Sequence, residues 1–251
     1  MYYNKGMVYI TGDTHGLKDT GKFNSAYFLK HVNKPGNIVI ITGDSGITWN
    51  KKSMADCIEF YSKFKCMFLF VDGNNDNFDI LNKLPVENYC GGKVHRVSTN
   101  LVHLMRGEIF DLEGHTYLAF GGADSWDRYR EFYFEEDKDK DYRGKGRRNP
   151  HINWWKEERP SKEEFENAIK NLEKHNNKVD VILTHETRTD NIKNYFDWSI
   201  HHITCRMLDY IYRKADFKHW YFGHHHYDVD CSKVETCMFN NIIKVENLDK
   251  I

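Results

Sequence analysis

The chain has 251 residues, of which 36 are Lys or Arg and 37 are Asp or Glu, and its formal net charge is −1. This balance excludes the overall basic character that nonspecific nucleic-acid binding favours, and no apolar stretch approaches the roughly 20 residues of a membrane-spanning helix. With 40% apolar and 15% aromatic residues the chain can bury a sizeable core, so we expect a single cytoplasmic domain over residues 1–251.

Strands and helices alternate in the first part of the chain. Apolar runs predict strands at residues 7–10, 38–41 and 67–71. Helices are predicted at residues 24–32, 53–64 and 78–84. The spacing of apolar residues is ambiguous in the first of these helices, and Pro85 ends the third. The alternation favours an α/β fold.

The pattern changes in the middle of the chain. Consecutive strands at residues 94–97, 101–112 and 116–120 should form an antiparallel layer. A helix begins at Ser161, which forms a capping box with Glu164, and its buried stripe would be Phe165, Ile169 and Leu172. Further strands are predicted at residues 179–183, 220–222 and 241–245.

A polar segment at residues 121–155 interrupts this pattern. A long polar connection in a compact domain is either a functional lid or a solvated loop, and both interpretations stay open. If it is functional, its arginines would bind substrate phosphates through paired hydrogen bonds. These residues are Arg128, Arg130, Arg147 and Arg148. Trp154-Trp155 leads directly into the capped helix, which favours core packing for this pair.

The six cysteines contain no Cys-x-x-Cys pair and lie mostly in apolar contexts. We expect reduced, buried thiols. A disulfide between Cys231 and Cys237 is the alternative.

Five short segments each follow a predicted strand and present Asp, Asn or His. They are Gly12-Asp13-Thr14-His15-Gly16, Gly43-Asp44, Gly73-Asn74-Asn75-Asp76, Thr184-His185-Glu186 and Gly223-His224-His225-His226. The ends of neighbouring strands converge in space, so these segments can build one site. Carboxylate, imidazole and amide groups without thiolate indicate Mn²⁺, Fe or Zn²⁺. A single such residue after a strand is more often a turn former or helix cap, but the joint occurrence of all five is not.

In this order the segments resemble the calcineurin-like metallophosphoesterase family, whose pattern is D-x-H, G-D, G-N-H-D/E, H and G-H-x-H. The resemblance covers most of the chain and implies a four-layer sandwich of two mixed β-sheets flanked by helices. It also implies a phosphoesterase with two divalent metal ions, Mn²⁺ being favoured and Fe, Zn²⁺ or Ni²⁺ the alternatives. The ligands it implies are Asp13, His15 and His226 for one ion, Asn74, His185 and His224 for the other, and Asp44 as the bridge.

The chain departs from the family pattern at Asn75, where the resemblance implies a His that protonates the leaving oxygen or stabilises the transition state. An amide can donate a hydrogen bond but cannot deliver a proton at neutral pH. Losing general-acid assistance typically costs roughly 10²–10⁴ in rate. The enzyme would then use substrates with good leaving groups, or obtain the proton from His201, His202 or His225, or retain only phosphate binding.

We expect a phosphoric ester hydrolase that acts on a phosphate ester or phosphoanhydride, in a small nucleotide-like substrate, with Asp44 and Asn75 as catalytic residues. A metal-dependent binder or sensor of phosphorylated ligands is the alternative interpretation. A nuclease is a third, which the near-zero charge disfavours. The sequence carries no indication of oligomeric state.

Overall fold

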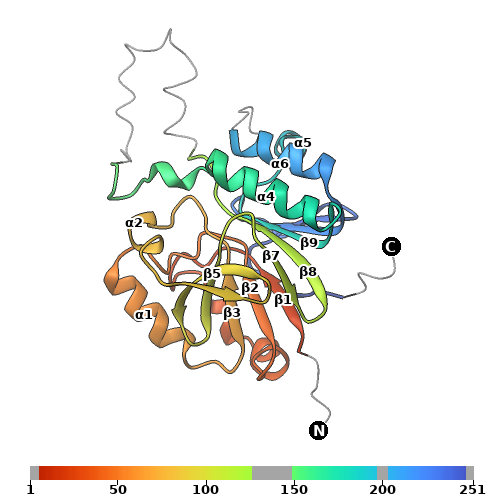
Figure 1. The fold of residues 1–251 in the computed structure, drawn as a ribbon. Coiled ribbons are helices and arrows are strands. Elements are labelled where there is room, and N and C mark those ends of the chain that lie inside the picture. The colour runs from red at the N-terminus through yellow and green to blue at the C-terminus, as the bar shows by residue number, and fades with distance from the viewer. Residues whose placement is uncertain (1–5, 126–148, 197–202, 247–251) are drawn as a thin grey trace.

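The computed structural model describes residues 6–125, 149–196 and 203–246, which form two β-sheets packed face to face between helices (Figure 1). The strand order of the first sheet is β13 (Ile243–Lys244), β1 (Val8–Thr11), β2 (Ile38–Ile41), β3 (Met67–Phe70), β6 (Leu101–Leu104), β5 (Gly92–Ser98) and β4 (Val86–Tyr89). The order of the second is β11 (Val229–Ser232), β12 (Glu235–Cys237), β10 (Asp216–Phe222), β9 (Lys178–Thr184), β8 (His115–Phe120) and β7 (Ile109–Leu112).

Both sheets are mixed, with parallel strands in the middle and antiparallel strands at the edges. In the first sheet β1, β2, β3 and β6 run parallel, and in the second β8, β9, β10 and β12 do so. The central strands are apolar at successive positions, as in the Ile-Val-Ile-Ile sequence of β2, because both faces of these strands are buried. The expected fold of two mixed sheets flanked by helices is confirmed.

Three apolar clusters lie between the four layers, one at each interface. The central cluster lies between the sheets and includes Ile40 of β2 and Leu183 of β9. The outer face of the first sheet is covered by α1 (Lys51–Tyr61) and α2 (Phe78–Leu81), and that of the second by α4 (Lys162–Lys174) and α6 (Ile203–Lys214) (Figure 1). A short helix, α5 (Thr189–Asn191), precedes α6.

The antiparallel pairing expected in the middle of the chain is confirmed for β5 with β6 and for β7 with β8, but the prediction of a single layer is wrong, because the two pairs lie in different sheets. The strand predicted at residues 101–112 is broken after β6, and its second half, β7, belongs to the other sheet. At the break, Gly107 has a φ of +78°, and a Cβ there would lie 2.7 Å from the backbone nitrogen of Ala168 in α4. The chain therefore crosses between the sheets at a point that only glycine can occupy.

Several element boundaries also differ from prediction. Residues 24–32 do not form one helix: a 3₁₀ turn (Gly21–Asn24) is followed by a π-helical turn (Phe28–Val32). Helix α1 begins earlier than predicted because Asn50 accepts a hydrogen bond from the backbone of Ser53. The capping box between Ser161 and Glu164 is confirmed. Strands β4, β11 and β12 and helices α5 and α6 were not predicted.

Three further expectations concern membrane helices, the cysteines and the tryptophan pair. Within the described ranges, no helix is both long and apolar enough to cross a bilayer. Cys231 and Cys237 are free thiols, so the alternative disulfide between them is not formed, and Cys90 is exposed rather than buried. Trp154 and Trp155 are both buried, as core packing requires.

Candidate metal centre

The five segments with Asp, Asn or His lie at the carboxyl ends of β1, β2, β3, β9 and β10. These strands are neighbours within their sheets, so their ends meet where the two sheets face each other. The structure brings the predicted ligands together in two groups. Within each group, one donor atom from every residue lies within 4.8 Å of the others.

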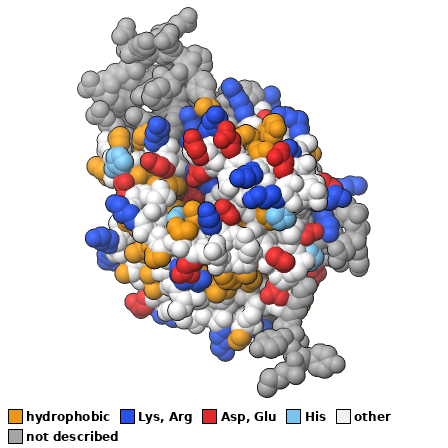
Figure 2. All heavy atoms as spheres, viewed as in Figure 1, with side chains coloured by type: hydrophobic (Ala, Val, Ile, Leu, Met, Phe, Trp, Pro, Cys, Tyr) orange, Lys and Arg blue, Asp and Glu red, His pale blue; other side chains and the backbone are white. Residues whose placement is uncertain are grey.

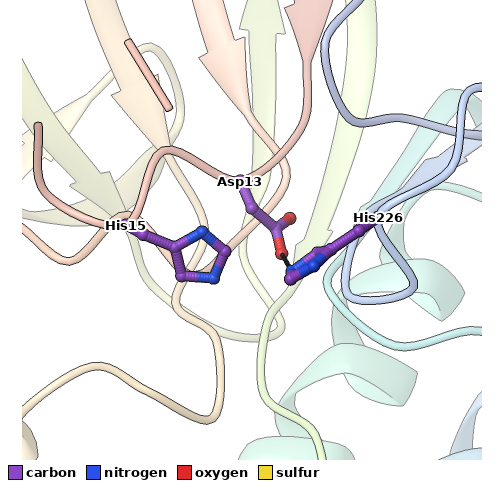
Figure 3. A group of neighbouring side chains, drawn as sticks. All are labelled: Asp13, His15 and His226. Atoms are coloured by element: carbon purple, nitrogen blue, oxygen red, sulfur yellow. Dashed lines mark ion pairs between the residues drawn. The ribbon is translucent and has the colours of Figure 1, made fainter. Parts of the chain in front are cut away.

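The first group consists of Asp13, His15 and His226 (Figure 3). The Nε2 atom of His226 is 3.2 Å from Oδ2 of Asp13. The Nδ1 atom of His15 is 2.7 Å from Oδ2 of Asp19, which orients the ring so that Nε2 is free to serve as a donor atom. Sequence reasoning missed this role of Asp19.

The second group consists of Asp44, His185 and His224. The Nδ1 atom of His185 donates to the backbone oxygen of Thr42 at 2.9 Å, which leaves Nε2 as its acceptor atom. That Nε2 is 3.2 Å from Nδ1 of His224 and 3.2 Å from Oδ1 of Asn74. All three ligands predicted for the second ion therefore lie beside Asp44.

Asp44, a member of the second group, also faces the first group. Its Oδ2 is 3.6 Å from Nε2 of His15 in the first group, and its Oδ1 is 3.4 Å from Nε2 of His185 in the second. Each carboxylate oxygen thus faces a different histidine. This arrangement suits a carboxylate that would bridge two ions.

The backbone at these strand ends is strained. The φ angles of His15, Asp44, His224 and His226 are 43°, 39°, 68° and 57°, in the left-handed region that residues with a Cβ rarely adopt. Such conformations cost on the order of 1–3 kcal/mol each and concentrate at functional sites. Gly43 contributes to the close packing, because a Cβ there would lie 2.1 Å from Nδ1 of His185.

The electrostatics of the site favour bound positive charge. Burial raises the pKa of Asp44, but the neighbouring His185 and His15 outweigh it and hold that pKa well below its ordinary value. Burial lowers the pKa of His15, but the hydrogen bond and charge of Asp44 raise it to about 9. Burial also lowers the pKa of His185, but the charges of Asp44 and Asp13 raise it to about 10. The buried carboxylates thus attract a cation.

The donor atoms fit divalent metal ions. Among the described residues, the buried Oδ2 of Asp13 accepts no hydrogen bond and has only the Nε2 atom of His226 near it, at 3.2 Å, so a cation bound between these two atoms would satisfy the oxygen. The set of carboxylate, imidazole and amide groups contains no thiolate, which suits Mn²⁺, Fe or Zn²⁺.

The residues considered as proton donors differ in their positions. Asn75 lies in the site, with its Nδ2 2.6 Å from Oδ2 of Asp44. His225 points elsewhere: its Nε2 is 2.9 Å from Oε1 of Glu186, and its ring stacks on Phe196 with centroids 3.9 Å apart. His201, His202, Arg128, Arg130, Arg147 and Arg148 lie outside the described residues.

Ser125 and Glu158 form a hydrogen-bonded chain to Asn74 that the sequence did not reveal. The Nδ2 atom of Asn74 donates to Oγ of Ser125 at 3.3 Å, and that hydroxyl donates to Oε2 of Glu158 at 2.7 Å. Glu158 is fully buried and also accepts a hydrogen bond from the backbone of Ser125. This chain turns Oδ1 of Asn74 toward His185. The only sequence signal is that Ser125 lies near the start of the polar segment and Glu158 lies just after its end.

Comparison with known proteins agrees with this geometry. The family model of calcineurin-like phosphoesterases matches residues 6–228. The chain belongs to the calcineurin-like phosphoesterase family. This family is metal-dependent and acts on phosphate esters, as the resemblance in the sequence implied.

Other comparisons with this calcineurin-like phosphoesterase are more distant. No curated protein matches the chain. The crystal structure of phosphopantetheinyl hydrolase (PptH) from Mycobacterium tuberculosis matches with 10% sequence identity and a TM-score of 0.42. The match covers 94% of this chain and 88% of that chain.

Proposed function

We propose that this chain is a phosphoesterase that uses two divalent metal ions to hydrolyse a phosphate ester or phosphoanhydride in a small nucleotide-like substrate. The observation that carries the proposal is the position of Asp44. One of its oxygens faces His15 and the other faces His185, so a single carboxylate serves both groups. A protein that bound one ion would not need a carboxylate placed in this way.

The proposed ligands divide between the two groups. Asp13, His15 and His226 would hold one ion, Asn74, His185 and His224 the other, and Asp44 would bind both. Two bound ions would neutralise phosphoryl charge, orient the ester and lower the pKa of the attacking water. Mn²⁺ is our first choice, and Fe, Zn²⁺ or Ni²⁺ are alternatives, because O and N donors are mixed without sulfur.

Asn75 sets the kind of substrate in this proposal. Its amide donates a hydrogen bond at the site but supplies no proton at neutral pH. Unless His201 or His202 supplies the proton, the leaving oxygen departs as an anion. Phosphoanhydrides and aryl esters release stable anions, whereas alkyl esters do not, so we place the natural substrate in the first class.

Loss of catalysis with retention of ligand binding is the second candidate function, and Asn75 in place of the family's His is the observation that favours it. The retention of two complete ligand groups weighs against it. A nuclease is the third candidate. Acidic and basic side chains are interspersed on the face shown in Figure 2, which gives that face no basic field for a polymer backbone.

An assay separates these candidates. The protein loaded with Mn²⁺ would be tested with an aryl phosphodiester, an aryl phosphomonoester and a panel of phosphorylated metabolites, with released phosphate or aryl alcohol as the readout. Turnover that a chelator abolishes and Mn²⁺ restores supports the enzyme. Thermal stabilisation by nucleotides without any turnover would instead support the binder.

A further inference from the structure

A hollow of about 430 Å³ adjoins the candidate metal centre. It is lined by the loop after β1 and by the start of α1, and His15 belongs both to its wall and to the first ligand group. A molecule whose phosphate is held at the metal centre can therefore extend into this hollow. Its volume exceeds what a single phosphate needs and lies in the usual range for small organic ligands, about 300–1,000 Å³.

The hollow combines an aromatic ring with a cation. Trp49 is half-buried in its wall, with the ring centroid 6.4 Å from that of His15. The Nζ atom of Lys18 lies 4.8 Å from the centroid of the Trp49 ring. Lys18 takes part in none of the ion pairs found within the described residues, whereas the neighbouring Lys52 is paired with Asp56 at 2.6 Å. Lys18 lies over the ring of Trp49 without a carboxylate partner in the described part of the chain, so it can turn from the ring to a phosphate and leave the ring face to a planar group.

The walls of the hollow are held to the metal centre by backbone contacts. The backbone nitrogen of Gly16 donates to the oxygen of Ser45 at 2.8 Å, which joins the loop after β1 to the loop that carries Asp44. The backbone oxygen of Trp49 accepts a hydrogen bond from Nδ2 of Asn77 at 3.1 Å, on the loop that carries Asn75. The position of Trp49 is therefore fixed relative to the proposed reaction site.

We propose that this hollow binds the leaving group of the substrate, and that the leaving group is a nucleoside phosphate. The proposal rests on the proposed function and names its substrate class: a phosphoanhydride of a nucleotide. Water adds to the scissile phosphorus and loses a proton to solvent, the bond from phosphorus to the bridging oxygen breaks, and that oxygen leaves with the electron pair. The nucleobase stacks on Trp49, and Lys18 pairs with the phosphate of the departing nucleotide. A phosphate leaves without protonation, as the amide at position 75 requires.

Two substrates with the same reacting bond test this assignment. A nucleoside 5′-diphosphate and inorganic pyrophosphate both contain a phosphoanhydride, but only the first has a base. Trp49→Ala should raise KM for the nucleoside diphosphate about 5- to 150-fold, the range that stacking of a base on an aromatic side chain supports, and leave KM for pyrophosphate unchanged. Trp49→Phe should restore most of the loss. Tyr27→Ala, which alters an exposed aromatic residue in a separate hollow, is the matched control.

Equilibrium dialysis separates failure of this assignment from failure of the proposed function. A nucleoside monophosphate should bind the wild-type protein without turnover. Both Trp49→Ala and Lys18→Gln should weaken this binding. Binding of the corresponding nucleoside, which has no phosphate, should be weakened by Trp49→Ala but not by Lys18→Gln. Equal effects of Trp49→Ala on both hydrolysis substrates, or no binding of the nucleoside monophosphate by the wild-type protein, would overturn the assignment. If the protein still hydrolysed aryl esters in that case, the proposed phosphoesterase function would stand.

Discussion

Asn75 binds both carboxylate oxygens of Asp44. Its backbone nitrogen donates to Oδ1 at 2.8 Å, and its side-chain Nδ2 donates to Oδ2 at 2.6 Å. Hydrogen bonds to an ionised carboxylate are among the stronger ones in proteins, so Asn75 fixes the orientation of Asp44. The residue that departs from the family pattern thus has a positive role, which is to hold the proposed bridge.

The first prediction concerns the leaving group. Because Asn75 supplies no proton, log kcat should fall steeply as the pKa of the leaving alcohol rises along a series of aryl esters. Asn75→His should flatten this dependence and speed the poorest leaving groups most, provided that the metal content, measured in parallel, is unchanged. Asn82→His, at an exposed site after α2, is the matched control.

A shallow dependence in the wild-type protein would contradict this prediction. If Asn75→His also slowed every substrate alike, another group would supply the proton. His201 and His202 would then be the next positions to change.

The second prediction concerns Ser125 and Glu158. Ser125→Ala or Glu158→Gln should free the amide of Asn74 to rotate and weaken metal binding roughly 10- to 100-fold, as loss of groups that orient ligands typically does. Calorimetric titration with Mn²⁺ measures this without turnover. Ser161→Ala removes the cap of α4 and should lower stability by about 1 kcal/mol with no change in metal affinity. Unchanged affinity in both Ser125→Ala and Glu158→Gln would mean that Asn74 needs no such support.

The fold class, and the polar residues that meet at the strand ends, could be predicted from the sequence because both depend on local pattern. The continuous apolar runs of β1, β2 and β3 mark buried parallel strands, and Asp13 and Asp44 follow them directly. A polar residue at the end of such a run can be identified from the sequence without knowing which distant residues it will contact.

Features that depend on distant partners were not predictable. Arg106 can be buried because its guanidinium forms an ion pair with the buried Asp72. The chain crosses between the two sheets at this residue, within a segment whose sequence predicts one strand. Ser125, Glu158 and Trp49 have no distinctive local pattern. Their relation to the site follows from tertiary contacts alone.

The third prediction concerns His225. Because its ring stacks on Phe196 and its Nε2 meets the buried Glu186, we expect a structural role rather than proton donation. His225→Ala should lower the free energy of unfolding by about 1–3 kcal/mol, since it removes one of the partners of the buried carboxylate of Glu186. The leaving-group dependence of kcat should not change. A steeper dependence in His225→Ala would assign the proton to this residue after all.

The fourth prediction concerns the arginines of the polar segment. If they engage substrate phosphates, Arg128→Ala, Arg130→Ala, Arg147→Ala or Arg148→Ala should raise KM for a multiply charged substrate far more than for a small aryl ester. Steady-state kinetics with both substrates is the measurement. Equal effects on the two substrates would indicate a solvated loop.

Metal content and activity of Asp44→Asn test the central claim most directly. The wild-type protein should retain two Mn²⁺ per chain, while Asp44→Asn should lose at least one ion and fall to near-background hydrolysis with its fold intact by circular dichroism. Asp216→Asn, on an exposed carboxylate, should behave as wild type. Full activity in Asp44→Asn, or a wild-type protein that binds no divalent metal at any pH above neutrality, would contradict the proposed two-metal phosphoesterase.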